Sequence, residues 1–293
     1  MSRLKTSMER LAERYPLKRV AITGAGSGLG RDLARLFAEA GWTLWLNDID
    51  EPRLSRIASE CEDCGASISA HRFDVSDLEA FLKATSAFEA DHGGVDIVFT
   101  SAGIGVGGTF LETESVHIRE VIEVNLLGTM WAGRAFLPSM AKARRGHFVT
   151  IASAAAFHGL PHLAAYAATK AGVVQFSETI RSELAPFNVD VTTKMTTLYT
   201  SDIAEFTRGS EAEREKARSL VAMAPWSSQE LAESLVDHVA RRHFYMVAPG
   251  QSRFLWRFKR VLPERYLRLM PRIFPKIEAK LLAKAAERKM DAI

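Results

Sequence analysis

Cysteine is nearly absent from this chain of 293 residues, and long apolar runs are absent altogether. The two cysteines, Cys61 and Cys64, have the spacing of half a zinc site, but no second pair supplies the other two ligands that structural zinc normally takes. We therefore expect neither a disulfide framework nor a metal centre. Residues 1–16 mix charged residues with scattered leucines and lack the apolar stretch of a secretory signal. No run approaches the length needed to cross a bilayer. These absences predict a cytoplasmic protein, or one on the cytoplasmic face of a membrane.

The chain alternates short apolar runs rich in β-formers with longer helical stretches. Strands are predicted at 19–23, 43–47, 67–73, 96–100, 147–151, 189–193 and 244–248. The main helices are predicted at 29–40, 116–143, 164–184 and 227–239, the last opened by a capping box of Ser227 and Glu230. This alternation predicts right-handed βαβ units. We expect an α/β fold: a doubly wound, Rossmann-type parallel sheet in a three-layer sandwich, forming a single domain.

Glycines fill the junction between the first strand and its helix. Gly24, Gly28 and Gly30 fit the pattern G-x3-G-x-G, which allows a tight turn and close approach of a pyrophosphate to the helix N-terminus. Asp48 ends the second strand, where an acidic residue can bind both ribose hydroxyls of NAD and repel the 2′-phosphate of NADP. Neither Ser27 nor Ile49 is basic, so the sequence favours NAD over NADP.

A tyrosine and a lysine lie four residues apart at the start of a predicted helix. Tyr166 and Lys170 therefore share one helical face. An unperturbed phenol, with a pKa near 10, is a poor base at neutral pH, and a nearby ammonium favours the phenolate. Ser153 follows the fifth strand and can orient a substrate oxygen toward Tyr166. A Tyr-x3-Lys pair alone is mostly coincidence, whereas the pair with this serine and an upstream nucleotide loop is specific.

In combination, these motifs resemble the short-chain dehydrogenase/reductase family over about Lys18 to Ala248. The resemblance implies that Tyr166 is the catalytic acid/base, that Lys170 lowers its pKa, that Ser153 positions the substrate and that Asn125 orders a water in a proton relay. The cofactor-binding residues that it implies are Gly24, Ser27, Gly28, Leu29, Gly30, Asp48, Asp74, Val75, Ala102, Gly103, Tyr166, Lys170 and Thr200. It also implies a homo-oligomer, a dimer or tetramer, paired through the helices near 116–143 and 164–184.

Two segments depart from the family's pattern. Ser101 stands where the family usually has asparagine after the fourth strand, and 195–197 reads Met-Thr-Thr where Pro-Gly is usual. Either Thr200 or Ser201 can take the role of the family's threonine that contacts the nicotinamide carboxamide. These departures motivate a second hypothesis, a catalytically silent nucleotide-binding sensor or scaffold.

Two regions break the strand–helix rhythm. Residues 198–226 form a long polar stretch with no predicted strand, which is typical of a lid. Residues 251–293 carry a net charge of +8 against +3 for the whole chain, with Trp, Phe and Leu between the basic residues. Such a segment suits an anionic membrane surface, while packing over the substrate cleft or a partner subunit is an equal alternative. Nucleic acid is not expected, because no recognition fold accompanies the charge.

The predicted organisation is therefore an N-terminal extension (1–17), an NAD-binding catalytic domain (18–250) and a basic amphipathic extension (251–293). The expected reaction is interconversion of an alcohol and a carbonyl on a small-molecule substrate. Both interpretations of the tail favour a lipophilic substrate. His158 and His162 lie in the loop between Ser153 and Tyr166, which would wall the substrate pocket, but we expect solvated side chains there, because a solvated loop histidine is the commoner case.

Overall fold

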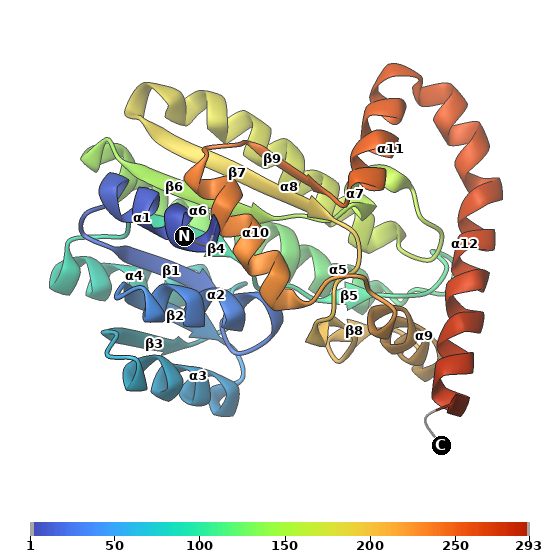
Figure 1. Cartoon of the computed structure of the whole chain (residues 1–293), viewed down its shortest axis with the longest axis horizontal. Helices are drawn as coiled ribbons and strands as arrows, with labels where there is room; N and C mark the ends of the chain where they lie inside the picture. The colour runs from blue at the N-terminus through green and yellow to red at the C-terminus, as the bar shows by residue number, and fades with distance from the viewer. Residues whose placement is uncertain (1–2, 292–293) are drawn as a thin grey trace.

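Over the residues that the computed structural model describes, 3–291 (side chains to 287), seven parallel strands form the central sheet, in the order β3-β2-β1-β4-β6-β7-β9 (Figure 1). The strands are β1 (Arg19–Thr23), β2 (Thr43–Asp48), β3 (Ile68–Arg72), β4 (Ile97–Thr100), β6 (Gly146–Ile151), β7 (Val189–Thr196) and β9 (Tyr245–Ala248). Positions 1–2 and 292–293 of the two predicted extensions lie outside the described residues. The predicted doubly wound sheet is confirmed.

Helices cover both faces of this sheet (Figure 1). One face packs against α1 (Arg3–Arg14), α2 (Gly28–Glu39), α3 (Glu51–Asp63) and α10 (Ser228–Ala240). The other packs against α4 (Leu78–His92), α6 (Gly128–Ala143) and α8 (Ala164–Leu184). Adjacent residues of one strand serve opposite faces: Leu44 and Leu46 enter the first core and Trp45 the second. Burial on both faces explains why the strands are continuous apolar runs.

The long helix predicted over 116–143 is interrupted. It consists of α5 (Ser115–Ile122), a π-helical turn η1 (Glu123–Leu127) and α6. Single π-helical turns within helices occur often at functional sites. This turn carries Asn125, whose side chain is fully buried. Apolar periodicity cannot reveal one extra residue in a turn, so this break was missed.

The lid predicted to have no strand contains regular structure. A short 3-10 turn η3 (Asp202–Ala204) leads to β8 (Thr207–Arg208) and α9 (Glu211–Ala222). β8 pairs in parallel with β5 (Gly105–Val106), which follows β4. The expectation of no strand in this segment was wrong, because a two-residue strand formed by a distant pairing leaves no local pattern. The capping box of Ser227 and Glu230 is confirmed at the start of α10.

The first helix belongs to the core. Leu11 and Tyr15 are buried in the cluster that covers the α2 and α10 face of the sheet. Arg3 and Ser7 both bond the buried carboxylate of Asp237 on α10, with Arg3 Nη2 at 2.5 Å from Oδ2 and Ser7 Oγ at 3.0 Å from Oδ1. These contacts extend the sandwich to the N-terminal segment.

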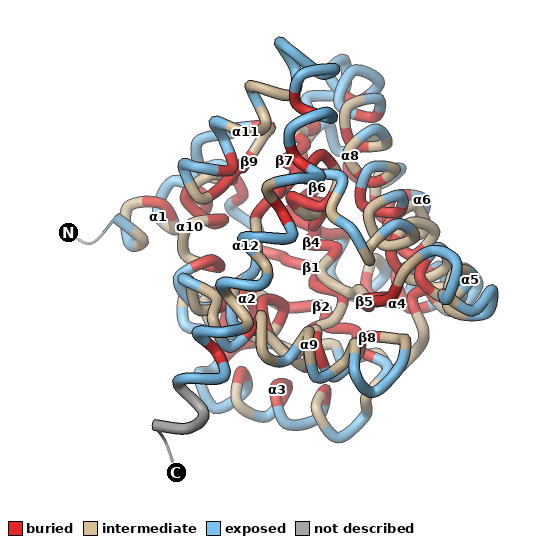
Figure 2. The backbone as a smooth tube through the Cα atoms, turned by 90° about the vertical axis from the view of Figure 1, so that its right-hand side faces the viewer, coloured by how far each residue is buried: buried red, intermediate tan, exposed pale blue. Residues whose placement is uncertain are grey.

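The C-terminal segment forms a helical hairpin at the carboxyl ends of the strands (Figure 1). It consists of the helix α11 (Gly250–Val261) and the longer helix α12 (Pro263–Asp291). α11 follows β9 directly and contacts α7 (Ala155–His158), while α12 contacts α9. Much of α12 faces solvent (Figure 2). Over residues 3–291, no helix combines the length and the apolar character that a membrane span requires.

Candidate active site

The glycine loop between β1 and α2 is built for close approach of the backbone. A Cβ on Gly30 would lie 2.1 Å from the carbonyl oxygen of Gly24, and one on Gly24 would lie 2.7 Å from the Cα of Ala102. Gly28 has a positive φ of +47°, and Ser27 is the N-cap residue of α2. Side chains at Gly24 and Gly30 would therefore collide with backbone. The tight turn brings the backbone N–H groups at the start of α2 to the surface where a pyrophosphate would bind, so the loop fits the predicted cofactor, although the Gly28 amide bonds Asp202 in this structure.

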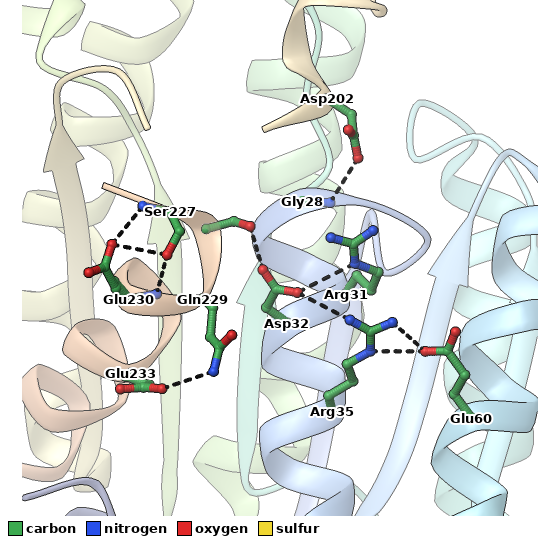
Figure 3. A network of polar contacts seen from close by, with 11 residues as sticks. Gly28, Arg31, Asp32, Arg35, Glu60, Asp202, Ser227, Gln229, Glu230 and Glu233 are labelled. Atoms are coloured by element: carbon green, nitrogen blue, oxygen red, sulfur yellow. Dashed lines mark hydrogen bonds and ion pairs between the residues drawn. The ribbon is translucent and has the colours of Figure 1, made fainter. Parts of the chain in front are cut away.

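A polar network holds α2 in place behind this loop (Figure 3). Asp32 is buried on α2 and accepts a hydrogen bond from Ser228 on α10. Arg35, one turn further, binds Glu60 of α3 with 2.7 Å between Nη2 and Oε2. Leu29 points its side chain into the apolar core, at 2% exposure. The helix that would face the phosphates is thus anchored to both neighbouring helices.

Asp48 lies at the carboxyl end of β2, against the glycine loop. Its Oδ2 accepts from the Gly26 amide at 2.8 Å, and its Oδ1 accepts from the Asp50 amide at 3.0 Å. The sequence argument missed a basic side chain here: Arg53 of α3 has its Cβ 2.8 Å from where a Cβ on Gly26 would be. Its position in the sequence could have revealed it, since Arg53 lies in the first turn of α3, five residues after Asp48. The edge therefore holds both an acidic and a basic group.

The predicted adenine-side and ribose-side residues also gather at the strand ends. Asp74 Oδ1 accepts from the amide of Ser76 at 2.9 Å and so orders the turn after β3. Val75 is buried and packs on Gly128. The amide of Ala102 donates to Thr23 Oγ1 at 3.2 Å, which joins the end of β1 to the loop after β4. This bond ties down the segment that contains the departure at Ser101.

Tyr166, Lys170 and Ser153 are brought together as predicted. Lys170 Nζ lies 5.7 Å from the centroid of the Tyr166 ring, and it donates to the carbonyl oxygen of Ile151 at 2.9 Å. Ser153 interacts with the Tyr166 hydroxyl through a hydrogen bond. Ser153 Oγ also accepts from the amide of Ala155 at 3.2 Å. The serine is thereby fixed between the start of α7 and the phenol.

The electrostatics differ in one respect from the expectation. Burial raises the pKa of Tyr166, an effect that the hydrogen bond from Ser153 opposes. Burial also lowers the pKa of Lys170 to about 8, so this amine is mostly protonated at pH 7. In the chain alone, desolvation outweighs any lowering of the Tyr166 pKa by Lys170. A positive charge bound next to the phenol would favour the phenolate.

Asn125 fastens the neighbouring loop with its side chain. Its Oδ1 accepts from the Ile104 amide at 2.8 Å, and its Nδ2 donates to the Ile104 carbonyl at 2.9 Å. A Cβ on Gly103 would lie 3.0 Å from Asn125 Oδ1 and 3.5 Å from Lys170 Nζ. Asn125, Gly103 and Lys170 are therefore neighbours, and the water-ordering role of Asn125 stays a prediction.

A second lysine was missed by the sequence analysis. Lys194 lies on β7, 2% exposed, with Nζ 4.2 Å from the ring centroid of Tyr199. Burial and the positive charge of Lys170 hold the pKa of Lys194 well below its usual range. Burial, then the charges of Tyr166 and Asp32, raise the pKa of Tyr199. The only sequence signal was a lysine directly after the predicted strand at 189–193, a strand that also contains Asp190 and two threonines.

The two candidates for the carboxamide contact lie in different places. The Thr200 amide donates to the Trp226 carbonyl at 2.8 Å, and Thr200 forms a bridge with Ser227. Ser201 instead lies against the glycine loop, with its Cβ 3.5 Å from the position of a Cβ on Gly28. Ser201 is thus closer than Thr200 to the loop that would carry the cofactor.

Apolar side chains and the lid cover the catalytic tyrosine candidate. Ile104, Val106 and Val121 form a buried cluster on which Tyr166 and Phe206 pack. Phe206 also lies under the guanidinium of Arg53, whose Cζ is 5.1 Å from the ring centroid. A substrate that reaches Tyr166 would therefore meet an apolar wall and the lid.

The predicted loop histidines have unequal surroundings. His158 is buried at 5% exposure, with Nδ1 2.8 Å from the hydroxyl of Tyr266 on α12, and burial lowers the pKa of His158 to about 4. His162 Nδ1 lies 3.9 Å from Glu213 Oε1 on α9. For His158 the expectation of a solvated side chain is wrong, because the C-terminal helix covers it.

A doubly wound sheet with a glycine loop after β1, and with a serine, a tyrosine and a lysine together at the strand ends, defines a dinucleotide-dependent oxidoreductase. A family model for short chain dehydrogenases matches residues 18–212. The chain belongs to the short-chain dehydrogenase/reductase family, and its relatives are named oxidoreductases or dehydrogenases.

Relatives and solved structures agree with this assignment. Estradiol 17-beta-dehydrogenase 11 of Pongo abelii is 32% identical over 253 residues, covering 86% of this chain and 82% of the relative. Probable oxidoreductase EphD of Mycobacterium tuberculosis is 32% identical over 255 residues, 84% of this chain, but the match spans only 43% of that relative. A short-chain dehydrogenase/reductase from Burkholderia phymatum, solved in complex with NAD, has a TM-score of 0.80 at 26% identity, over 84% of this chain and 94% of that one.

Proposed function

We propose that this protein interconverts an alcohol and a carbonyl on a lipophilic substrate, with NAD as the hydride carrier and Tyr166 as the acid/base. The observation that carries the proposal is the cluster of Ser153, Tyr166 and Lys170 beside a glycine loop that fits a dinucleotide. When bound, the cofactor would supply or accept the hydride. Gly24, Ser27, Gly28, Leu29 and Gly30 would hold its phosphates.

The proton step falls to this chain's own residues. In the oxidation direction, the Tyr166 phenolate takes the proton of the substrate hydroxyl, and the Ser153 hydroxyl holds the substrate oxygen. In reduction, the Tyr166 phenol returns a proton to that oxygen. Lys170, charged at neutral pH, supplies positive charge near the ring. Asn125 would order a water behind Lys170, which would connect the phenol to solvent.

Asp48 supports NAD as the preferred cofactor. Its carboxylate lies at the end of β2 beside Gly26, where it would accept from ribose hydroxyls and repel a 2′-phosphate. Arg53 is already engaged by acids, with Nη2 2.7 Å from Glu205 Oε2 and Nε 3.3 Å from Asp50 Oδ2. The Burkholderia phymatum neighbour is a complex with NAD. Asp74, Val75, Ala102, Gly103 and Thr200 complete the proposed cofactor contacts.

The apolar cluster around Tyr166 supports a lipophilic substrate. We expect kcat/KM, measured with NAD on a series of straight-chain alcohols, to rise about fourfold for each added methylene until the pocket is filled, since each buried CH2 contributes about 0.8 kcal/mol. With NADP as cofactor, kcat/KM should be lower at every chain length. A series that is flat or falling in chain length would contradict the lipophilic assignment, and a preference for NADP would contradict the cofactor assignment.

The C-terminal hairpin has two different faces, which bear on both interpretations of the basic tail. Tyr266, Met270 and Phe274 are buried and pack on Leu160, in the loop after α7. The outer face leaves large apolar side chains in solvent, among them Phe254 and Val261 at 70% and 75% exposure. Exposed basic residues flank them: Arg253, Arg257, Arg260, Arg265, Arg268 and Arg272. We propose that this outer face contacts an anionic membrane surface on the cytoplasmic side.

A flotation experiment with the full-length chain tests the membrane contact. Wild type should float with vesicles containing about one third phosphatidylserine, and a Phe254→Ser, Val261→Ser double variant should lose most of that binding, because both residues lie on one face of α11. Leu82→Ser, Leu111→Ser removes two exposed leucines elsewhere and serves as the matched control. Equal flotation of the two double variants, or no flotation of wild type, would reject the proposal.

Self-association is part of the same proposal. α5 carries exposed apolar side chains, Val116 and Ile122 at 51% and 39% exposure, beside α8. A dimer or tetramer paired through the helices over 116–143 and 164–184 would bury them.

The alternative function, a catalytically silent nucleotide sensor, is motivated by the departures at Ser101 and 195–197. Such a protein would bind the cofactor without turnover of any alcohol or carbonyl.

A further inference from the structure

Residues 201–208, the first part of the lid, reach the glycine loop on the proposed cofactor side of the site. Asp202 Oδ2 accepts a hydrogen bond from the backbone amide of Gly28 at 3.2 Å (Figure 3). Gly28 is the first residue of α2, where aligned peptide dipoles and free N–H groups attract an anion. A side-chain carboxylate of this chain therefore lies at the helix end to which the cofactor's pyrophosphate is assigned.

Further contacts hold the lid in this position. Glu205 binds Arg53 with 2.7 Å between Oε2 and Nη2, and Phe206 lies beneath the same guanidinium. Phe206 also packs near Tyr166, and Thr207 and Arg208 pair with Gly105 and Val106. The lid thus contacts the loop after β1, the start of α3 and the segment after β4. Asp202 is held at the Gly28 amide by these surrounding contacts as well as by its own bond.

We propose that Asp202 competes with the cofactor's pyrophosphate for the N-terminus of α2 and thereby sets the affinity for the dinucleotide. This inference rests on the proposed function, because it requires the glycine loop to be the pyrophosphate site. Two negative groups cannot share the same few N–H donors without repulsion. Cofactor entry therefore requires the Asp202 carboxylate to leave Gly28, and the lid segment must shift with it. The contacts of Arg53 with Glu205 and Phe206 oppose that movement.

A binding measurement tests this directly. We expect Asp202→Asn to bind NADH about fivefold more tightly than wild type, by fluorescence titration of the full-length chain, because a carboxylate at a helix N-terminus is worth up to about one factor of ten in binding. Asp202→Ala provides a second variant with the same expected direction. ADP-ribose, which keeps the pyrophosphate, should show the same gain by competition, whereas adenosine should show none.

Glu211→Gln is the matched control, since it removes one negative charge from the exposed start of α9, away from Gly28. Its Kd for NADH should equal that of wild type. If the two Asp202 variants bind NADH as wild type does, or more weakly, the competition proposal is overturned while the proposed function stands. If neither wild type nor any variant binds NADH or NADPH, the assignment of the loop fails, and the proposed function fails with it.

Discussion

Tyr166→Phe should lower kcat by roughly 10²–10⁴-fold while leaving the Kd for NADH within about twofold of wild type. Phenylalanine keeps the ring, which packs on the Ile104, Val106 and Val121 cluster, and removes only the hydroxyl that Ser153 bonds. The loss should therefore appear in the chemical step and not in folding or cofactor binding. Steady-state rates with the best alcohol of the chain-length series, together with an NADH titration, measure the two effects separately.

Tyr199→Phe is the control that this structure offers. Its ring lies beneath Lys194 Nζ, and its hydroxyl is close enough to Tyr166 for their charges to interact. Since phenylalanine preserves the stacking of the ring on the amine, this variant should keep kcat within a few-fold of wild type. Full activity in the Tyr166 variant, or an equal loss in both variants, would contradict the assignment of the acid/base to Tyr166.

The structure explains why some predictions came from the sequence and others did not. Residues that act through backbone sterics or fixed helical spacing could be predicted from the sequence. Gly24 and Gly30 avoid a collision with backbone only because they lack Cβ atoms. Tyr166 and Lys170 share a face because they are four residues apart. Strand positions followed from burial on both faces of a parallel sheet.

What the sequence could not provide depends on contacts between distant segments. β8 exists only because Thr207 and Arg208 meet Gly105 and Val106, a hundred residues earlier. In the sequence, Asp202 is one of several acidic residues in a polar stretch, and only the fold shows that its carboxylate bonds the Gly28 amide. The sequence likewise could not show that the pKa of Tyr166 is raised, because desolvation depends on the three-dimensional environment.

The composition of the basic tail could not decide between contact with a membrane and packing over the substrate cleft, since one helix can do both. Tyr266 is fully buried against His158, the last residue of α7, while Leu267, next in sequence, is 50% exposed. Along α12, exposed positions that we propose to face a membrane thus alternate with buried positions that pack on α7 and on Leu160. This arrangement joins the proposed membrane contact to α7, which carries His158.

His147 gives the second large expected effect, a loss of stability in acid. It lies on β6 at 0% exposure, with Nε2 2.8 Å from Thr192 Oγ1. Because the Thr192 hydroxyl donates to the His243 carbonyl, it accepts from His147 Nε2–H, so the imidazole is the neutral tautomer with its lone pair on Nδ1. Nδ1 has no hydrogen-bond partner among the described residues. A proton added there would be buried without an acceptor.

Burial accordingly lowers the pKa of His147 from 6.5 to about 4. The unfolded chain then binds more protons than the folded chain between these two values, so this contribution to stability is present above pH 6.5 and is lost as the pH falls toward 4. The full loss is about 3 kcal/mol, at 1.36 kcal/mol for each pKa unit.

Urea unfolding at pH 7 and pH 4.5 should show that the free energy of unfolding of wild type falls by about 2 kcal/mol more than that of His147→Gln over this interval. His92→Gln, at an exposed position, should lose as much as wild type. An equal loss for wild type and His147→Gln would mean that His147 accepts a proton in the folded state as readily as in the unfolded chain.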